Sequence, residues 1–341
     1  MLEESADAQE LSKPRVDFTL VNQESQLLEA IKTLGNLPGP IAIDAERASG
    51  FKYFPRAYLL QFYKIGGPIY LVDPTAFDGD NSPVSDLANL IAKDEWILHA
   101  ATQDLPCLLE LGFRPSKIFD TELASRLLGL EKVGLGSISE SLLGLKLAKE
   151  HSAVDWSTRP LPDDWLVYAA IDVDVLHDLK ASLSKELQNQ GKQEWAKEEF
   201  DQLVFFKAKE KSGERWRSTS GLHSVKDRQQ LASVKSLWLA RDALAQKLDV
   251  ASGRLVPDSS LIVAATQAPR SRAELLANRA FAGRATRSYA DVWWQALEAS
   301  YSSSELPELK IQASSIPNHR IWKQKFPEAH SRLEQAKTVL T

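Results

Sequence analysis

Residues 41–73, IAIDAERASGFKYFPRAYLLQFYKIGGPIYLVD, hold three short runs rich in branched and aromatic side chains. The runs are IAIDAE (41–46), YLLQFYK (58–64) and PIYLVD (68–73). Such runs are typical of β-strands, and Gly66-Gly67-Pro68 is a turn signal between the last two. We therefore expect three strands joined as hairpins.

Downstream of these strands, the pattern alternates between helix and strand. The expected elements are a helix from Ser82-Pro83 through Ile91, a buried strand WILHAA (96–101), a helix capped by Thr102 that runs to Leu111 and ends at Gly112, a short strand KIFD (117–120), a helix from Thr121, and a long helical period over 162–187. This order predicts an α/β fold in which helices flank a mixed sheet.

The strand signals mostly disappear after the polar stretch 184–212, which we interpret as an exposed connecting helix. Segments 226–248, 258–266, 270–280 and 287–300 have the pattern of short helices and predict an all-α module. The expected organisation is a flexible tail (1–15), an α/β domain with its connecting helix (16–212), the helical module (213–302) and a partial helical region (303–341).

The composition is that of a globular chain of two domains, with 341 residues, 43% hydrophobic and 26% charged. No run approaches the ~20 apolar residues of a membrane-spanning helix, and MLEESADAQELSKPR (1–15) lacks the features of a secretory signal. The single cysteine, Cys107, excludes an internal disulfide. No GxxxxGK[ST] motif supports ATP use. We expect a cytoplasmic monomer without membrane or ATP partners.

Charge is unevenly distributed along the chain. Residues 213–301 hold 13 Lys and Arg against 8 Asp and Glu, whereas the remainder holds 28 against 38. A basic segment suits phosphates and an acidic one suits metal cations. Chance variation of the surface is the alternative interpretation.

Two acidic side chains lie in the first strand-like run. Asp44 and Glu46 alternate with Ala45, so in a strand they point to the same face. Paired carboxylates beside apolar residues are costly unless a cation neutralises them, and a divalent metal ion does this with oxygen ligands. Taken alone, the pair also fits a solvated strand end.

Three further residues are candidates for a catalytic or metal-binding site. Asp104 follows the strand WILHAA, where an acid at a helix start is also favoured by the helix dipole. Tyr168 and Asp172 lie four residues apart and share a helical face, whereas Asp174 points elsewhere. An amphipathic helix with a packed tyrosine is the alternative for this pair. The combined order Asp-x-Glu, Asp, Tyr-x-x-x-Asp is far less expected by chance than any of its parts.

This combination resembles the tyrosine branch of the DEDD superfamily of 3′→5′ exonucleases, and most closely the ribonuclease D family. The resemblance covers residues 35 to about 185 through IAIDAERASGFKYFPRAYLLQF, HAATQDLPCL, IFDTELASRLLG and DWSTRPLPDDWLVYAAIDVDVL. It implies a ribonuclease-H-like fold. It also implies that Asp44, Glu46, Asp104 and Asp172 bind two Mg²⁺ or Mn²⁺ ions, with Tyr168 orienting the attacking water.

Four other residues of this region have expected roles. Lys149 stands six residues before Asp155-Trp156, as a lysine of the family does, and could contact a substrate phosphate; a surface lysine without a role is the alternative. Asp120 is expected to be structural, near the cap of the helix from Thr121. His99 and Cys107 are expected to be core residues, because their neighbours are apolar.

The helical module resembles the HRDC domain from residue 218 to about 301. The matching stretches are SVKSLWLARDALAQKLDV, RLVPDSSLIVAA and PRSRAELLAN. Five arginines could bind nucleic-acid phosphates without reading sequence, or form a solvated helix face: Arg270, Arg272, Arg279, Arg284 and Arg287.

The leading hypothesis is a metal-dependent 3′→5′ exoribonuclease that releases nucleoside 5′-monophosphates. Its expected partner is RNA with a free 3′ end, such as a transfer RNA precursor. A DNA exonuclease is the first alternative, because 2′-hydroxyl recognition depends on the geometry of the pocket. A catalytically inert nucleic-acid-binding protein is the second alternative.

Overall fold

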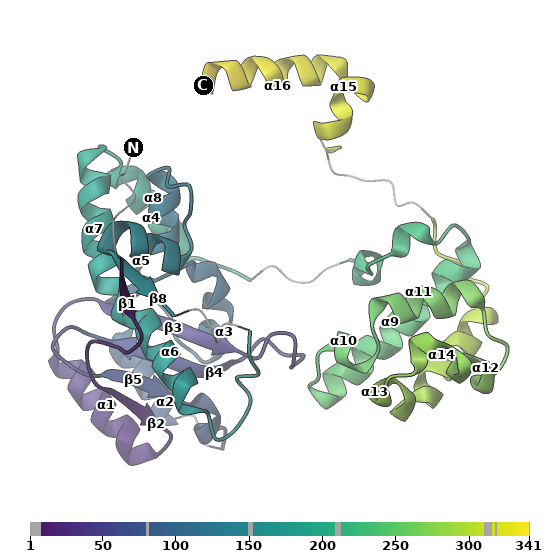
Figure 1. Ribbon diagram of the computed structural model, residues 1–341, viewed down its shortest axis with the longest axis horizontal. Helices are drawn as coiled ribbons and strands as arrows, with labels where there is room; N and C mark the ends of the chain where they lie inside the picture. Colours follow the sequence, from purple (N-terminus) through teal and green to yellow (C-terminus); the bar gives the residue numbers. More distant parts are fainter. Residues whose placement is uncertain are drawn as a thin grey trace. The chain divides into compact units, whose positions relative to one another are not determined.

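The computed structural model describes residues 8–79, 82–148, 153–208, 213–309, 316–317 and 319–340. The chain divides into two compact units (Figure 1). The first groups the chain up to Gly213 with Leu244–Leu255, and the second groups Glu214–Ala243 with Val256–Thr341. The segment Leu244–Leu255, which lies inside the predicted 213–302 module, is thus assigned to the first unit.

A six-stranded mixed sheet forms the centre of the first unit, as the sequence predicts. Its order is β2-β5-β4-β3-β6-β7, with bounds β2 Phe18–Val21, β3 Ile41–Arg47, β4 Ala57–Tyr63, β5 Ile69–Val72, β6 Glu95–Leu98 and β7 Lys117–Asp120. The pairs β3/β4 and β4/β5 are antiparallel, which confirms the two hairpins. The pairs β2/β5, β3/β6 and β6/β7 are parallel.

Helices cover both faces of this sheet (Figure 1). Ala42 of β3 faces the apolar cluster formed with α6 (Asp163–Asp174) and α7 (Leu176–Asn189), whereas Ile43 faces α1 (Glu24–Asn36) and α2 (Ser82–Ile91). Side chains alternate along a strand, so Asp44 and Glu46 lie on the same face as Ala42. The α6 face of the sheet therefore carries the acidic pair.

Several boundaries differ from the predictions. The predicted long helical segment is two helices, α6 and α7, which meet at Val175. Thr102 is not an N-cap, because it lies inside the 3₁₀ turn η2 (Ala101–Gln103), and α3 (Leu105–Glu110) begins after Asp104. The predicted tail is shorter than expected, since β1 (Gln9–Leu11) pairs in parallel with β8 (Leu145–Leu147).

The remaining helices of the first unit are short or amphipathic. Their bounds are α4 Thr121–Leu127, α5 Leu135–Leu143 and α8 Gln193–Val204. The connecting segment forms α8, and this helix is not wholly exposed because it buries Ala196 and Phe200. A ring contact between Phe200 and Phe119 of β7, with centroids 4.8 Å apart, attaches α8 to the edge of the sheet.

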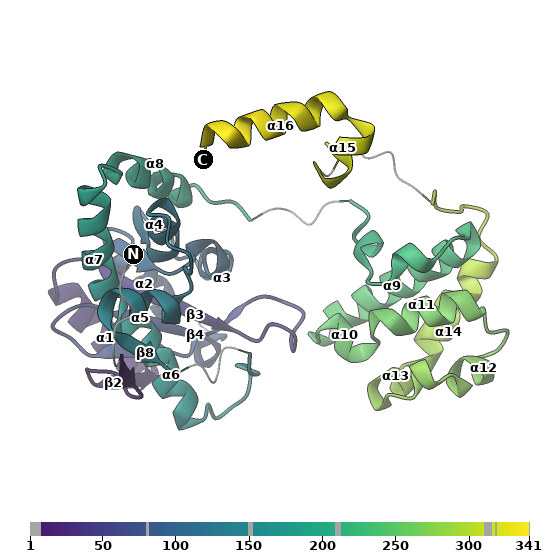
Figure 2. The same ribbon diagram turned by 45° about the horizontal axis from the view of Figure 1, so that its top comes forward.

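The second unit is all-α, as predicted (Figure 2). The helices of this part of the chain are α9 Arg228–Leu248, α10 Ser252–Leu255, α11 Asp258–Gln267, α12 Arg272–Ala277, α13 Arg284–Ser288, α14 Ala290–Tyr301, α15 Trp322–Lys325 and α16 Pro327–Leu340. The end of α9 and all of α10 group with the first unit. The core of the second unit includes Leu261, Leu275 and Trp293, each at most 1% exposed. Every helix within the described ranges is too short or too polar to cross a bilayer.

Candidate active site

Three carboxylates from two elements meet on the α6 face of the sheet. Asp44 and Glu46 are two residues apart on β3, and α6 carries Asp172 across that face. One oxygen from each of the three lies within 4.8 Å of the other two. Carboxylate oxygens are the preferred ligands of Mg²⁺ and Mn²⁺, so this donor set fits a divalent cation.

A fourth carboxylate, Asp104, reaches the same place from the turn after β6. It occupies the N-cap position of α3, but its side chain makes no capping hydrogen bond. Instead it shares a hydrogen bond with Asp44, and Oδ1 lies 3.3 Å from Nη2 of Arg47. The side chain thus faces the acidic cluster, as the superfamily resemblance predicts, rather than the helix terminus.

The four carboxylates repel one another in a buried setting. Burial raises the pKa of Glu46, Asp104 and Asp172 well above the ordinary range, and neighbouring carboxylates raise it further. Burial also raises the pKa of Asp44, against the opposing effects of the Ala45 amide and Arg47. A bound cation would remove this repulsion, because it favours the ionised form of every ligand.

Tyr168 lies one turn before Asp172 on α6. Its hydroxyl is hydrogen-bonded to the Asp172 side chain, and burial together with Asp172 raises the pKa of the phenol above its ordinary value. The phenol therefore stays protonated and can donate a hydrogen bond. Its ring lies beside the fully buried Trp156, with centroids 6.4 Å apart.

These side chains line a cavity of about 440 Å³. Its walls include the four carboxylates and Tyr168, together with Arg47, His99, Ala100, Gln103, Leu135, Gly136, Leu147, Ala148 and Leu176. This volume lies within the ordinary range of ligand pockets. His99 is only half-buried and lines the wall, so the expectation that it lies in the core is wrong.

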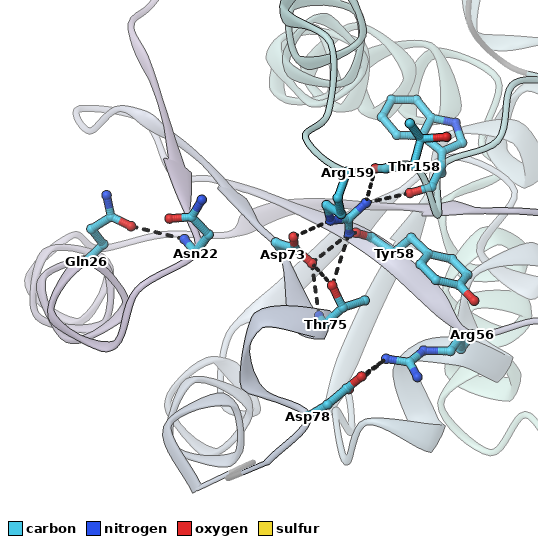
Figure 3. A network of polar contacts seen from close by, with 10 residues as sticks. Asn22, Gln26, Arg56, Tyr58, Asp73, Thr75, Asp78, Thr158 and Arg159 are labelled. Atoms are coloured by element: carbon cyan, nitrogen blue, oxygen red, sulfur yellow. Dashed lines mark hydrogen bonds and ion pairs between the residues drawn. The ribbon is translucent and has the colours of Figure 1, made fainter.

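Arg159 fastens the loop before α6 to the sheet (Figure 3). Its guanidinium donates two hydrogen bonds to Asp73, of 2.6 and 2.7 Å, and others to the backbone carbonyls of Tyr58, Trp156 and Thr158, of 2.7 to 2.8 Å. Asp73 follows β5 and Tyr58 lies on β4. The start of the segment that leads to Tyr168 and Asp172 is thereby fixed to two strands.

Asp120 performs the structural role predicted for it. Its side chain accepts hydrogen bonds from the amides of Glu122 and Leu123 and so caps α4. It also accepts from the amides of Ala100 and Ala101, where Ala100 has a left-handed φ of 57°. Asp120 thus fixes the turn that presents Asp104. Cys107 is fully buried, as predicted.

Sequence reasoning missed three polar residues around this site. Arg47 and Arg159 have partners distant along the chain, which no local pattern reveals. Gln61 stands opposite Asp44 in the β3/β4 register and is fully buried, and its amide makes no hydrogen bond within the described residues. The signal for Gln61 was available, since it is a lone polar residue inside the apolar run YLLQFY.

Six further residues were predicted to contact nucleic acid. Lys149 falls outside the described residues. The five arginines belong to the second unit, and all are exposed: Arg270, Arg272, Arg279, Arg284 and Arg287. Arg272 forms an ion pair with Asp291 at 2.6 Å.

The fold and the acidic site define an exonuclease-type domain followed by a helical accessory module. The family model for 3′-5′ exonuclease matches residues 18–188, and that for the HRDC domain matches residues 230–297. "Ribonuclease D" of Zymomonas mobilis is 33% identical over 252 residues, which cover 71% of this chain and 62% of that protein. The chain therefore belongs to the ribonuclease D family. It spans less than two thirds of the length of curated relatives such as those of Bartonella henselae (63%) and Zymomonas mobilis.

Solved structures have a similar fold. A protein from Bifidobacterium adolescentis is 36% identical with a TM-score of 0.87, and the match covers 94% of this chain and 82% of that one. Escherichia coli RNase D, described as an exoribonuclease involved in structured RNA processing, is 24% identical with a TM-score of 0.70. The match covers 95% of this chain and 85% of that one. The second likeness shows the fold alone.

Proposed function

We propose that this protein is a metal-dependent 3′→5′ exoribonuclease that releases nucleoside 5′-monophosphates. The observation that carries this proposal is the convergence of Asp44, Glu46, Asp104 and Asp172 with Tyr168 on one cavity. Four buried carboxylates with raised pKa values have little structural purpose without a cation. Membership of the ribonuclease D family supports the same chemistry.

Two divalent ions, Mg²⁺ or Mn²⁺, would be bound by the four carboxylates. When bound, such a pair supplies an activated water and stabilises the leaving oxygen of a phosphodiester. The carboxylates orient the ions, while the turn fixed by Asp120 and the loop fixed by Arg159 hold Asp104 and Asp172 in place.

Tyr168 would position the attacking water. Because the pKa of its phenol is raised, the hydroxyl keeps its proton and cannot act as a base near neutral pH. Its bond to Asp172 instead fixes an oxygen that can accept a hydrogen bond from water beside the carboxylates.

The substrate would be RNA with a free 3′ end, with transfer RNA precursors as the physiological class. The exposed arginines of the second unit supply charge for phosphates, and Lys149 is a further candidate contact. Both are sequence-independent contacts, which suits a nuclease that accepts many 3′ ends. The cytoplasmic location and the monomeric state stay predictions.

The test uses a 5′-labelled single-stranded RNA and a matched DNA strand, with Mg²⁺ or Mn²⁺ and then with EDTA. We expect a ladder that shortens from the 3′ end of RNA only with metal. The Asp44→Asn variant should lose turnover and keep RNA binding, whereas Asp163→Asn, an exposed acid at the start of α6, should stay active. Full activity of Asp44→Asn would contradict the site, and faster digestion of DNA would reassign the substrate. RNA binding without shortening would support an inert binding protein.

A further inference from the structure

His99 lines the same cavity as the acidic cluster. The β3/β6 register pairs Ala42 with Ile97 in parallel, and Asp44 and His99 each follow two residues further along their own segment. The β6/β7 register pairs Leu98 with Asp120, which places Thr121 on the other side of His99. The imidazole and the Asp44 carboxylate therefore both belong to the wall of this cavity.

Hydrogen bonding at Thr121 determines which nitrogen of His99 carries the proton. The Thr121 hydroxyl donates its single proton to the carbonyl of Leu98, at 3.2 Å. It can therefore only accept from His99, whose Nδ1 lies 2.9 Å away. Nδ1 is the protonated nitrogen, and Nε2 of the neutral ring is left with an open lone pair.

Nε2 is available to a ligand. His99 lines the cavity, and no hydrogen bond to Nε2 occurs within the ranges that the structure describes. Burial lowers the pKa of the ring to about 4, so it is a neutral acceptor at physiological pH. The carboxylate of Glu122 acts in the opposite direction and raises the pKa of the ring.

Several other polar groups of the cavity are already engaged. The carboxylates are the ligands for cations, the Tyr168 hydroxyl bonds to Asp172, and Arg47 is a donor paired with Asp104. His99 is thus a neutral acceptor beside the place where the scissile phosphate would bind. The group attached directly to that phosphate is a ribose, whose hydroxyls are donors.

We propose that His99 accepts a hydrogen bond through Nε2 from a hydroxyl of the 3′-terminal ribose. This inference rests on the proposed exonuclease function for the position of the phosphate. A 2′-deoxyribose lacks one of the two possible donors, and a 3′-deoxyribose lacks the other. Removing the hydroxyl that donates to Nε2 leaves this nitrogen without a hydrogen-bond partner, and this lowers the rate of cleavage.

The experiment measures single-turnover release of the last nucleotide from three RNAs that differ only at the 3′ end: ribose, 2′-deoxyribose and 3′-deoxyribose. For the wild type, we expect one of the two deoxy ends to slow release by about three- to tenfold. His99→Phe keeps a ring but lacks the acceptor, so it should cleave the ribose end more slowly by a similar factor and cleave that deoxy end at the same rate as the ribose end. His99→Gln, which offers an amide oxygen, should recover part of the difference.

The exposed His223, located in the second unit, provides the matched control, and His223→Phe should keep the wild-type ratio. Equal rates for all three ends in the wild type, or unchanged discrimination in His99→Phe, would overturn the proposal. If His99→Phe does not fold, His99→Leu, which also lacks an acceptor, decides the question in its place.

Failure of the proposed function would look different, because the wild type would not shorten any RNA. In that case the affinities of AMP, 2′-deoxy-AMP and 3′-deoxy-AMP, measured with Mg²⁺, still test His99. Weaker binding of one deoxynucleotide by the wild type but not by His99→Phe supports the inference. Equal affinity of the wild type for all three contradicts it.

Discussion

Arg159 and Asp73 lie 86 residues apart and form a two-pronged ion pair, with Nε 2.6 Å from Oδ2 and Nη2 2.7 Å from Oδ1 (Figure 3). Asp73 is also the N-cap of the 3₁₀ turn Pro74–Phe77 and bonds to the amide and hydroxyl of Thr75. The pair therefore joins the end of β5 to the loop that precedes α6. The geometry of the active site depends on this join, because α6 carries Tyr168 and Asp172.

Replacing this arginine should destabilise the first unit. Lysine carries the charge but cannot make the paired bonds and the three carbonyl bonds at once. We expect Arg159→Lys to cost about 2–4 kcal/mol in urea unfolding, since Asp73 is only 8% exposed and would lose partners. Arg56→Lys is the control, because its pair with the 55%-exposed Asp78 should contribute at most about 1 kcal/mol. Equal effects of the two substitutions would contradict this account.

Asp120 should contribute more to the free energy of unfolding than an ordinary helix cap does. It accepts four backbone hydrogen bonds, two within α4 and two from the turn at Ala100 and Ala101. Asp120→Ala should therefore cost about 3 kcal/mol or more in chemical unfolding. Asp227, which accepts from the amides of Gln229 and Gln230 at the start of α9, is the comparison, and Asp227→Ala should cost about 1 kcal/mol. A smaller cost at Asp120 than at Asp227 would contradict this prediction.

The acidic cluster should make stability fall as the pH rises when no metal is present. The carboxyl pKa values are raised in the folded chain, whereas in the unfolded chain they are ordinary, near 4. Between these values the unfolded chain ionises first, so the free energy of unfolding falls as the pH rises until the folded pKa is passed. In EDTA we expect a lower Tm at pH 8 than at pH 5, with Mg²⁺ raising Tm more at pH 8.

The double variant Asp44→Asn/Glu46→Gln serves as the control for this pH effect, because it removes two of the four interacting charges. Its Tm in EDTA should change less between pH 5 and pH 8, and added Mg²⁺ should shift it little. A wild-type Tm in EDTA that rises steadily from pH 5 to pH 8 while that of the variant is flat would contradict the predicted direction.

Tyr168→Phe separates water positioning from metal binding. The substitution removes the hydroxyl that bonds to Asp172 and leaves the ring against Trp156. We expect the rate of cleavage to fall by about 10²- to 10⁴-fold, the usual effect of losing a positioned proton-transfer group. Mn²⁺ affinity measured by calorimetry should change little. A large loss of Mn²⁺ affinity would instead assign Tyr168 to the support of the ligands.

The sequence predicted the acidic residues of the site better than it predicted the residues that surround them. Asp44 and Glu46 could be paired because a strand has a period of two, and Tyr168 and Asp172 because a helix repeats near four. The surroundings depend on register across the sheet, which local patterns do not contain. The sequence neighbours of His99 are apolar, and only the folded chain places it beside Thr121 in the cavity wall.

The same limit explains the errors in the fold. The strand FTLV (18–21) pairs with β5, 51 residues further along the chain at Ile69, and no turn signal announces such a parallel partner. The helical period over 162–187 is continuous in sequence, yet the chain breaks it at Val175. Just before this break, Asp174 is buried and accepts hydrogen bonds from Arg15, which lies in the segment that we expected to be a tail.

The arginines of the second unit give a prediction that separates binding from catalysis. Arg279 and Arg284 are exposed and have no ion pair within the described part of the chain, so their charge is available to phosphates. Arg279→Ala and Arg284→Ala should each weaken RNA binding and reduce the slope of log affinity against log salt concentration by about 0.7. Arg272 is already paired with Asp291, so Arg272→Ala should have the smaller effect. Cleavage of a saturating RNA should stay near the wild-type rate in all three variants, because the carboxylates and Tyr168 are intact. An unchanged salt slope in both Arg279→Ala and Arg284→Ala would mean that this face does not contact RNA.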